Sequence, residues 1–354
     1  MTKLVDSPQL DVVQRACLDH YDLGRIESAG ALTGGMFAQP VLLRTDRGPR
    51  ILRVHTFRAT ESAFRFQAET VQWAFDQGVP CAPVQPTREG AWSVPLPGEE
   101  GAAAVHHYVE GASSDWPAWH RRKETEPDFL WRLGGYVGQM HNQLATAQPS
   151  GDPNLSSTLP PIQFAYLEPT YAHWQESISR INDQEEIACC AARRRLLELD
   201  PQIDRHWQRL LTLADRRQIA ALPRQIVHGD VSAVNLVWDE GNRAVFIDWD
   251  AVHYGHRLYD ALGDVLNRVP ENRPDWNRFR SDHVEQFLAG YSEVLDDPLS
   301  DLELELAPTF CLARQLEDLR QRVAALPRLA QAEDRKYARL IQMRVEMMDQ
   351  IETG

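Results

Sequence analysis

Hydrophobic and polar positions repeat with a period of two near the N-terminus and with a helical period further along the chain. Residues 41–45 and 50–55 alternate in the strand-like way, and the turn sequence Asp46-Arg47-Gly48-Pro49 separates them, so we predict a β-hairpin. In the second strand, alternation places Ile51, Arg53 and His55 on one face and leaves Leu52 and Val54 on the other.

A helix is predicted after this hairpin, and a lobe boundary beyond the helix. Apolar side chains recur at helical spacing at Phe64, Ala68, Val71 and Phe75. The helix is predicted to end at Gly78-Val79-Pro80. A short strand follows over residues 105–109, and Glu110-Gly111 breaks it. We therefore predict a small N-terminal lobe of residues 1–109 and a larger C-terminal lobe of residues 110–354.

The C-terminal part of the chain has the apolar spacing of amphipathic helices. Apolar stripes repeat every three or four residues over residues 129–144, 312–323 and 337–348, and we expect them to face a core. The chain has 354 residues, which suits two connected lobes. The predicted fold class is therefore α+β, with a small β-sheet lobe that carries one helix and a larger, mainly helical lobe.

The helical pattern is interrupted between residues 225 and 254, where polar side chains follow short apolar runs. The first run, Gln225-Ile226-Val227, leads into His228-Gly229-Asp230. The second run, residues 236–238, follows Asn235, and the third, residues 245–247, ends at Asp248. Turn residues separate the second run from the third, so we predict that the two pair as an antiparallel hairpin.

Antiparallel pairing would bring Asn235 and Asp248 together, because one begins its strand and the other ends the partner strand. Amide and carboxylate oxygens are ligands that Mg²⁺ prefers. Asp230 lies on the loop just before, where it could accept a hydroxyl proton or orient the hydroxyl for in-line attack on phosphorus. Each of these positions taken alone is better explained as a turn residue, and it is the ordered set that points to a site.

The ordered set resembles the signature of the aminoglycoside phosphotransferase and choline kinase superfamily, whose fold and mechanism are similar to those of protein kinases. That signature joins His-Gly-Asp, four residues and Asn to a later Ile-Asp-Trp or Ile-Asp-Phe. The resemblance implies a protein-kinase-like two-lobed fold, with Asp230 as the catalytic base and Asn235 and Asp248 as magnesium ligands. It also implies that Asp260 is a buried anchor and that His141 is a packed structural histidine.

In the small lobe the resemblance implies which residues bind the nucleotide, ATP or GTP. Gly34 and Gly35 correspond to a loop that covers the phosphates, since glycines let the backbone approach phosphate oxygens. The segment with His107, Tyr108 and Val109 resembles the hinge, where the adenine ring meets backbone groups.

Two features of the chain depart from the family pattern. Arg53 stands where the family has a strand lysine; a guanidinium still binds phosphate, but with a different reach. The resemblance also implies a helix glutamate that pairs with Arg53. Glu69 is the first candidate for this role, and Glu61 is the alternative. Ser232-Ala233-Val234 stands where the family often has His-Pro-Gly, and a β-branched residue in place of glycine restricts the loop backbone.

Composition and charge narrow the classes of partner. The net charge of −14 at pH 7 disfavours nucleic acid and anionic membrane surfaces as partners. No apolar stretch is long enough to span a bilayer, and the N-terminal residues lack a signal core. Five irregularly spaced cysteines fit reduced thiols. We therefore expect a cytoplasmic protein.

Three functions are compatible with these patterns. The leading one is magnesium-dependent transfer of the γ-phosphate of ATP or GTP to a hydroxyl of a small molecule, such as an aminoglycoside, an amino alcohol or a sugar. The alternatives are a bacterial stress-response-type protein kinase and a pseudokinase that binds nucleotide without turnover.

Acidic residues in the helical lobe bear on the acceptor. They are Glu168, Glu176, Asp183, Glu185, Glu186, Glu317 and Asp318. If they lined the acceptor pocket they would suit a cationic substrate, although ordinary solvated helix faces explain them at least as well.

Overall fold

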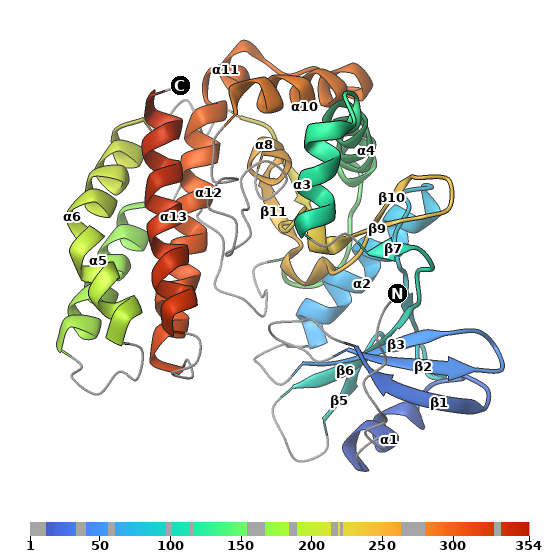
Figure 1. The fold of residues 1–354 in the computed structure, drawn as a ribbon. Helices are drawn as coiled ribbons and strands as arrows, with labels where there is room; N and C mark the ends of the chain where they lie inside the picture. The colour runs from blue at the N-terminus through green and yellow to red at the C-terminus, as the bar shows by residue number, and fades with distance from the viewer. Residues whose placement is uncertain are drawn as a thin grey trace.

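Two lobes of different secondary structure lie one above the other in the view of Figure 1, with a sheet in the lower lobe and mainly helices in the upper one. The structure is a computed structural model, and it describes residues 12–32, 40–55, 61–96, 101–113, 116–153, 167–183, 190–213, 219, 222–262, 280–328 and 334–353. The fold class is α+β, as the sequence predicted.

The lower lobe is built on an antiparallel sheet with strand order β1-β2-β3-β6-β4, and β5 pairs with β6 outside this path. Its elements are α1 (Val12–Leu18), β1 (Ile26–Ala31), β2 (Val41–Thr45), β3 (Arg50–His55), α2 (Glu61–Asp76), β4 (Val84–Gln85), β5 (Val94–Pro95) and β6 (Ala102–His107). β2 and β3 confirm the predicted hairpin, and β6 covers most of the strand predicted over residues 105–109, beginning three residues earlier.

The two faces of β3 have different neighbours. Leu52 and Val54 belong to the apolar cluster that includes side chains of α1. His55, on the opposite face, contacts Phe64 of α2, with 5.0 Å between the ring centroids. The alternation predicted for this strand is therefore confirmed, and it places Arg53 on the face that looks toward α2.

Helix α2 connects the two lobes because more than one of its sides is buried. Ala68 packs with the sheet, whereas Phe66 and Val71 belong to the core of the upper lobe. The apolar stripe continues at Ala74, while Phe75, which its spacing placed on the stripe, is 48% exposed. A helix turns by about 100° per residue, so the position three residues after Val71 stays on the buried side and the next one leaves it.

The upper lobe is mainly helical. Its helices are α3 (Trp116–Thr125), α4 (Phe129–Leu144), α5 (Leu167–Asp183), α6 (Cys190–Leu213), α8 (Arg257–Ala261), α10 (Ser281–Val294), α11 (Asp301–Glu305), α12 (Ala307–Ala325) and α13 (Asp334–Thr353). α4 packs against α10, and α6, α12 and α13 pack together on the other side of the lobe (Figure 1). The predicted apolar stripes lie in α4, α12 and α13, and they face the core.

Short antiparallel strand pairs interrupt the helices of this lobe. β8 (Arg224–Val227) pairs with β11 (His253–His256), and β9 (Leu236–Trp238) lies between β7 (Ala112–Ser113) and β10 (Ala244–Phe246). The short helices η2 (Ala233–Asn235) and η3 (Trp249–Ala251) flank the β9–β10 hairpin. That hairpin was predicted, and the expected lobe boundary after residue 109 falls between β6 and β7.

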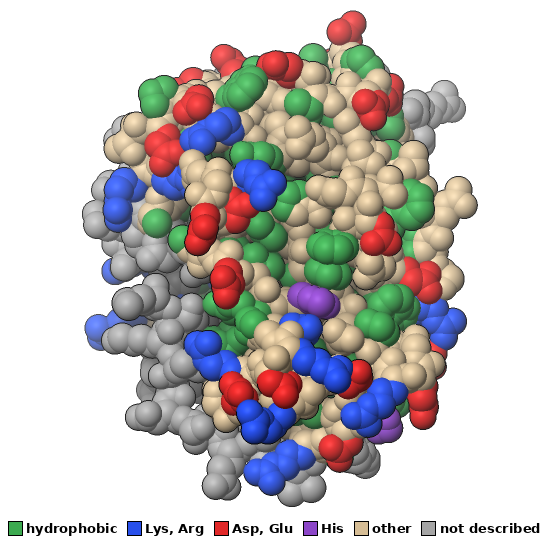
Figure 2. Space-filling view, turned by 90° about the vertical axis from the view of Figure 1, so that its right-hand side faces the viewer, with side chains coloured by type: hydrophobic (Ala, Val, Ile, Leu, Met, Phe, Trp, Pro, Cys, Tyr) green, Lys and Arg blue, Asp and Glu red, His purple; other side chains and the backbone are tan. Residues whose placement is uncertain are grey.

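Charges of both signs are mixed on the face drawn in Figure 2, which is the right-hand side of Figure 1. Lys and Arg side chains stand beside Asp and Glu side chains there, most densely over the lower lobe. Surface ion pairs of that lobe include Arg25 with Glu27 at 3.2 Å and Arg47 with Asp22 at 2.6 Å. Of the helices in the described ranges, none combines the length and the apolar character needed to cross a membrane.

Candidate active site

The loop after β8 carries the first part of the predicted site. His228-Gly229-Asp230 follows the last residue of β8 directly. Gly229 has a φ of +84°, and a Cβ atom at this position would lie 2.1 Å from the carbonyl oxygen of Ala251. Only glycine fits such a close approach with this backbone conformation, so the packing of the loop against η3 explains the middle residue of the His-Gly-Asp sequence.

His228 links this loop to the end of β10. Its Nε2 lies 3.1 Å from the carbonyl oxygen of Ile247, and its Nδ1 lies 3.3 Å from the backbone nitrogen of Asp230. Nε2 therefore donates and Nδ1 accepts, which is the pattern of a neutral ring. Burial lowers the pKa of His228, although the Asp260 carboxylate acts in the opposite direction, and the neutral ring is consistent with this shift.

Asp260 on α8 anchors the loop from within the core. Its carboxylate accepts hydrogen bonds from the backbone N–H groups of His228 at 2.8 Å and Gly229 at 2.9 Å. It also lies 3.0 Å from Nε2 of His141, whose Nδ1 is 2.7 Å from the hydroxyl of Tyr291. Burial would raise the pKa of Asp260, but the hydrogen bond from His141 and the neighbouring histidines outweigh it and lower that pKa. The roles expected for Asp260 and His141 are confirmed.

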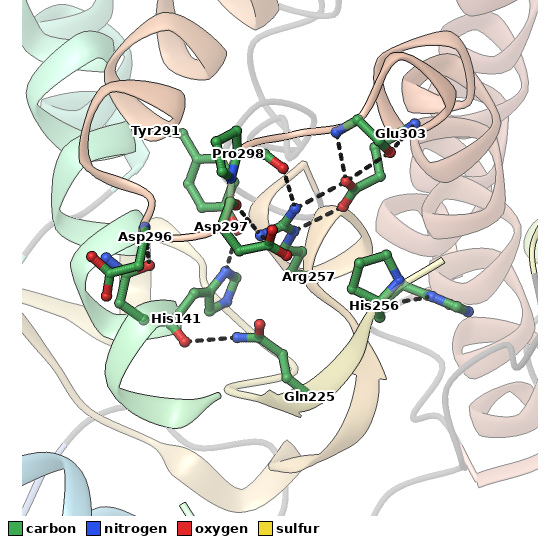
Figure 3. A network of polar contacts seen from close by, with 12 residues as sticks. His141, Gln225, His256, Arg257, Tyr291, Asp296, Asp297, Pro298 and Glu303 are labelled. Atoms are coloured by element: carbon green, nitrogen blue, oxygen red, sulfur yellow. Dashed lines mark hydrogen bonds and ion pairs between the residues drawn. The ribbon is translucent and has the colours of Figure 1, made fainter. Parts of the chain in front are cut away.

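A second polar network holds α8 in place (Figure 3). Arg257, the first residue of α8, donates to both carboxylate oxygens of Glu303 at 2.8 and 2.9 Å. The same guanidinium donates to the carbonyl oxygens of Asp297 and Pro298 at 2.7 and 3.1 Å. Because one planar group makes all of these bonds, α8 and its Asp260 are tied to the segment between α10 and α11.

Asp230 and Asn235 contact each other directly. The Nδ2 of Asn235 donates to the backbone oxygen of Asp230 at 3.0 Å and to its Oδ2 at 2.8 Å. The amide nitrogen must face these two acceptors, so the amide oxygen of Asn235 points away from them. The side chain of Asp230 is 29% exposed, which leaves the carboxylate accessible to an incoming hydroxyl.

Asp248 follows β10 with a left-handed backbone, at φ 62° and ψ 62°. Aspartate adopts this conformation more readily than most residues do, at a cost of roughly 1–2 kcal/mol. One residue earlier, the N–H of Ile247 donates to the backbone oxygen of Asn235 at 2.9 Å. Asn235 and Asp248 therefore leave adjoining ends of the hairpin, and Asn235 in turn contacts Asp230.

The oxygens gathered here have the chemistry of ligands for a hard divalent cation. The side chain of Asp248 is 34% exposed, and the amide oxygen of Asn235 is not used by Asp230. Mg²⁺ takes one or two such protein ligands and completes its octahedron with water and phosphate oxygens. No cluster of three or more His, Cys, Asp or Glu side chains that could hold a metal occurs among the described residues.

Arg53 reaches from β3 to two carboxylates of the upper lobe. Its Nη1 donates to Oδ1 of Asp248 at 2.8 Å, and its Nη2 donates to Oδ2 of Asp250 at 2.7 Å. Burial disfavours the charged guanidinium, but the carboxylates of Asp250 and Asp248 outweigh it and raise the pKa of Arg53. Burial would likewise raise the pKa of Asp248, and the charge and hydrogen bond of Arg53 instead lower it. Both groups are therefore ionised.

Glu69 does not pair with Arg53, so the expected partner is wrong. The Glu69 carboxylate accepts hydrogen bonds from the backbone nitrogen and the hydroxyl of Ser150, at 2.6 and 2.9 Å. The competitor Glu61 forms an ion pair with Arg65, one turn further along α2. Neither glutamate lies on the side of the helix that faces the site.

Gln67 is the α2 side chain that faces the site. Its Nε2 donates to Oδ1 of Asp250 at 2.8 Å, and Nδ1 of His55 lies 3.8 Å from Oδ2 of the same carboxylate. Burial lowers the pKa of His55, with the charge of Asp250 acting in the opposite direction. The helix therefore contributes an amide where the family resemblance had suggested a carboxylate, and the acid that pairs with Arg53 comes from the other lobe.

The remaining nucleotide-binding predictions fall on two segments of the lower lobe. The backbone nitrogen of His107 donates to the carbonyl oxygen of Pro83 at 3.0 Å. Tyr108 and Val109, which follow β6, make no hydrogen bond to another backbone group within the described ranges. Gly34 and Gly35 lie outside the described residues.

Arg314 of α12 is a charged neighbour of Asp230 that the sequence did not single out. Its Nη2 lies 3.3 Å from Oδ1 of Asp230, and its guanidinium carbon lies 5.8 Å from the ring centroid of Tyr259. The Arg314 side chain is only 8% exposed. A nearly buried positive charge therefore lies beside the carboxylate that is the candidate base.

The acids of α12 that could favour a cationic acceptor are engaged in ion pairs. Glu317 pairs with Arg320 at 2.9 Å, and Asp318 contacts Arg322 at 2.6 Å and Arg344 at 2.7 Å. The other acids are exposed on α5 or lie outside the described residues, namely Glu168, Glu176, Asp183, Glu185 and Glu186. The described part of the helical lobe therefore does not present these acids as a free anionic lining.

Sequence reasoning missed Asp250, Gln67 and Arg314. Asp250 had a usable signal, because it is the second acid of Asp248-Trp249-Asp250. Gln67 and Arg314 had none, since each meets its partner across a long stretch of chain, 183 and 84 positions away.

Known proteins resemble this chain in sequence and in fold. The family model described as the phosphotransferase enzyme family matches residues 30–296 of this chain. Over 135 residues, 37% of this chain and 42% of the other, the chain is 30% identical to the homoserine kinase of Caulobacter vibrioides. The chain therefore spans about two fifths of the length of the curated relatives it matches.

Solved structures are similar over nearly the whole chain. The spectinomycin phosphotransferase solved with ADP and spectinomycin matches with a TM-score of 0.64 and 13% identity, covering 98% of this chain and 100% of that one. A microcompartment-associated aminopropanol kinase matches with a TM-score of 0.63 and 16% identity, covering 95% of each chain. At these identities the likeness is one of fold, and it identifies the architecture as the two-lobed, kinase-like one.

Proposed function

The chain belongs to the phosphotransferase enzyme family, and on that premise we propose that it transfers the γ-phosphate of ATP or GTP, with magnesium, to a hydroxyl of a small molecule. The observation that supports the proposal is the contact between Asp230 and Asn235 beside the strand end that leads to Asp248. An accessible carboxylate lies in contact with one candidate metal ligand and close to the strand end that bears the other. Kinase-type phosphoryl transfer uses such an arrangement of base and metal ligands.

Each residue has a role that its contacts support. Asp230 is anchored through the loop by Asp260, and its carboxylate aligns the acceptor hydroxyl and takes its proton. Asn235 and Asp248 would hold magnesium, which when bound neutralises charge on the phosphates. Arg53 lies beside Asp248 and would bind phosphate oxygens with N–H groups that its two carboxylates do not use.

The proposal extends to the charge of the acceptor. A hydroxyl within hydrogen-bond distance of Asp230 would lie close to Arg314, whose guanidinium touches the same carboxylate. Guanidinium groups bind carboxylates well, often through two bonds. We therefore propose an acceptor that carries both a hydroxyl and a carboxylate. Homoserine, the substrate named for the Caulobacter relative, has both groups and is the first candidate.

A matched pair of substrates tests this choice. Homoserine and 3-aminopropan-1-ol differ only by the carboxylate, so the ratio of their kcat/KM values isolates it. A hydrogen bond to a charged group contributes about 1.5–3 kcal/mol, so homoserine should be favoured by roughly 10- to 150-fold. Arg314→Gln should bring the ratio close to one, while Arg314→Lys should keep part of it. Preference for the amine in the wild-type protein would reject the anionic acceptor.

The transfer itself is tested by nucleotide consumption across hydroxy amino acids, amino alcohols, aminoglycosides and sugars, with Asp230→Asn as the blank. Consumption with one acceptor in the wild-type protein, and none in the variant, is the expected result. Labelled phosphate appearing on a protein instead would favour the protein-kinase alternative. Nucleotide binding without any transfer would favour the pseudokinase alternative.

A further inference from the structure

Asp250 is a largely enclosed carboxylate with no role in the reaction described so far. Its side chain is 12% exposed, and both of its oxygens are occupied. Oδ2 accepts from Nη2 of Arg53 at 2.7 Å, and Oδ1 accepts from Nε2 of Gln67 at 2.8 Å. The carboxylate thus lies between strand β3 and helix α2 of one lobe while belonging to η3 of the other.

The guanidinium of Arg53 is fixed at two points. Nη1 bonds Asp248 at 2.8 Å while Nη2 bonds Asp250. A planar group held through both terminal nitrogens has a defined orientation, whereas a group held through one can rotate about that bond. Gln67 fixes Asp250 in turn, so the orientation of Arg53 is set by a chain of contacts that ends on α2.

The two carboxylates cannot be equivalent once a nucleotide binds. Asp248 is the candidate metal ligand, so its bond to Arg53 competes with metal binding. If Asp248 were the only partner, binding would leave Arg53 buried without a fixed carboxylate, which is unfavourable. With Asp250 present, Arg53 would keep one charged partner while Asp248 binds the metal.

We propose that Asp250 is the positioning residue for Arg53, supplying from the large lobe the carboxylate that was expected from helix α2. The inference rests on the proposed function, because it assigns Arg53 to the nucleotide phosphates. Gln67 completes the arrangement, since an amide can donate to Asp250 whereas a glutamate at that position would set two carboxylates against each other.

The first experiment measures nucleotide affinity directly. Asp250→Asn should weaken nucleotide binding by about 10- to 100-fold in titration calorimetry, because the bond to Arg53 loses its charge and a single amide oxygen cannot accept from both Arg53 and Gln67. KM for the acceptor should change by less than about twofold, since the hydrogen bonds of Asp250 lead to Arg53 and Gln67 rather than to Asp230. Asp239→Asn is the matched control, because it makes the same chemical change at the tip of the β9–β10 turn, where the carboxylate pairs with Arg243. That variant should bind nucleotide as the wild-type protein does.

A double-mutant cycle separates positioning from mere structural support. Gln67→Glu alone should also weaken nucleotide binding, because it adds a second negative charge beside Asp250. The double variant Gln67→Glu/Asp250→Asn exchanges amide and carboxylate across the same contact and keeps the net charge. It should bind nucleotide more tightly than either single variant, by roughly tenfold. Thermal unfolding of all variants shows whether each is folded.

These experiments distinguish failure of the proposed function from failure of the role assigned to Asp250. If the wild-type protein binds no nucleotide, the proposed function fails and the inference fails with it. If the wild-type protein binds nucleotide and Asp250→Asn binds it equally well, the proposed function stands and Asp250 has no positioning role. Purely additive effects in the cycle would also overturn the inference, since they would show that Gln67 and Asp250 act independently.

Discussion

The buried carboxylate of Asp260 offers a quantitative test of how the catalytic loop is held. The perturbation is Asp260→Asn, which keeps the size of the side chain and replaces one oxygen by an amide nitrogen. In the native structure one oxygen faces both the backbone N–H of His228 and Nε2 of His141, and the other faces the N–H of Gly229. An asparagine can turn its oxygen to only one of these sides.

The expected loss of stability follows from the hydrogen bonds that the variant cannot make. If the asparagine oxygen serves His228 and His141, its amide nitrogen faces the Gly229 N–H, and a buried donor without a partner costs about 1–3 kcal/mol. The two remaining bonds lose their charge, which removes about 1 kcal/mol from each. The free energy of unfolding should therefore fall by about 3–5 kcal/mol. Asp297→Asn, at a side chain that is 77% exposed and lies 3.7 Å from Arg257, should change it by less than about 1 kcal/mol.

Urea denaturation at several pH values measures both the size and the origin of this effect. The folded-state pKa of Asp260 is lowered from its ordinary value, so its contribution to stability is present above about pH 4 and is lost as the pH falls through the lower folded-state pKa. The difference between wild type and variant should shrink below about pH 4. A difference under about 1 kcal/mol at neutral pH, or one that does not change with acid, would refute the anchoring role.

Three further predictions follow from single contacts. Gly229→Ala should abolish turnover, because a Cβ atom would lie 2.1 Å from the Ala251 oxygen; a fully active variant would show that the loop can relax. Glu69→Gln should leave nucleotide affinity within about twofold, because its carboxylate bonds Ser150; a tenfold loss in titration calorimetry would restore its expected role. Asp248→Asn keeps a residue that tolerates the left-handed backbone, so it should weaken nucleotide binding with magnesium far more than without it, and equal losses would count against metal ligation.

Local patterns were sufficient to predict the strands and the catalytic segment. Alternation and turn chemistry predicted the β2–β3 hairpin. The turn between β9 and β10 sets the register of the second hairpin, and this register places Asn235 beside the strand end that precedes Asp248. The anchoring role of Asp260 came from the family resemblance, since its partners lie 31 to 119 positions away in the chain. The hairpins depend on interactions between residues that lie near one another in the chain.

The partner of Arg53 could not be predicted in the same way. Glu69 was chosen for its chemical type on α2, but position 67 faces the site, and two positions on a helix differ by about 200° in direction. Asp250 lies 197 positions from Arg53, so only the packing of the two lobes makes them neighbours. Arg314 likewise meets Asp230 through the packing of α12, which no local pattern specifies.

The most direct test of the central claim is phosphate transfer by Asp230→Asn, measured beside nucleotide binding in the same preparation. The substitution keeps the size of the side chain but replaces the carboxylate by an amide, which cannot take a proton. We predict that turnover falls by at least about 10²-fold, while the dissociation constant for nucleotide with magnesium stays within about threefold of the wild-type value. Transfer at the wild-type rate in this variant would contradict the assignment of Asp230 as the catalytic base.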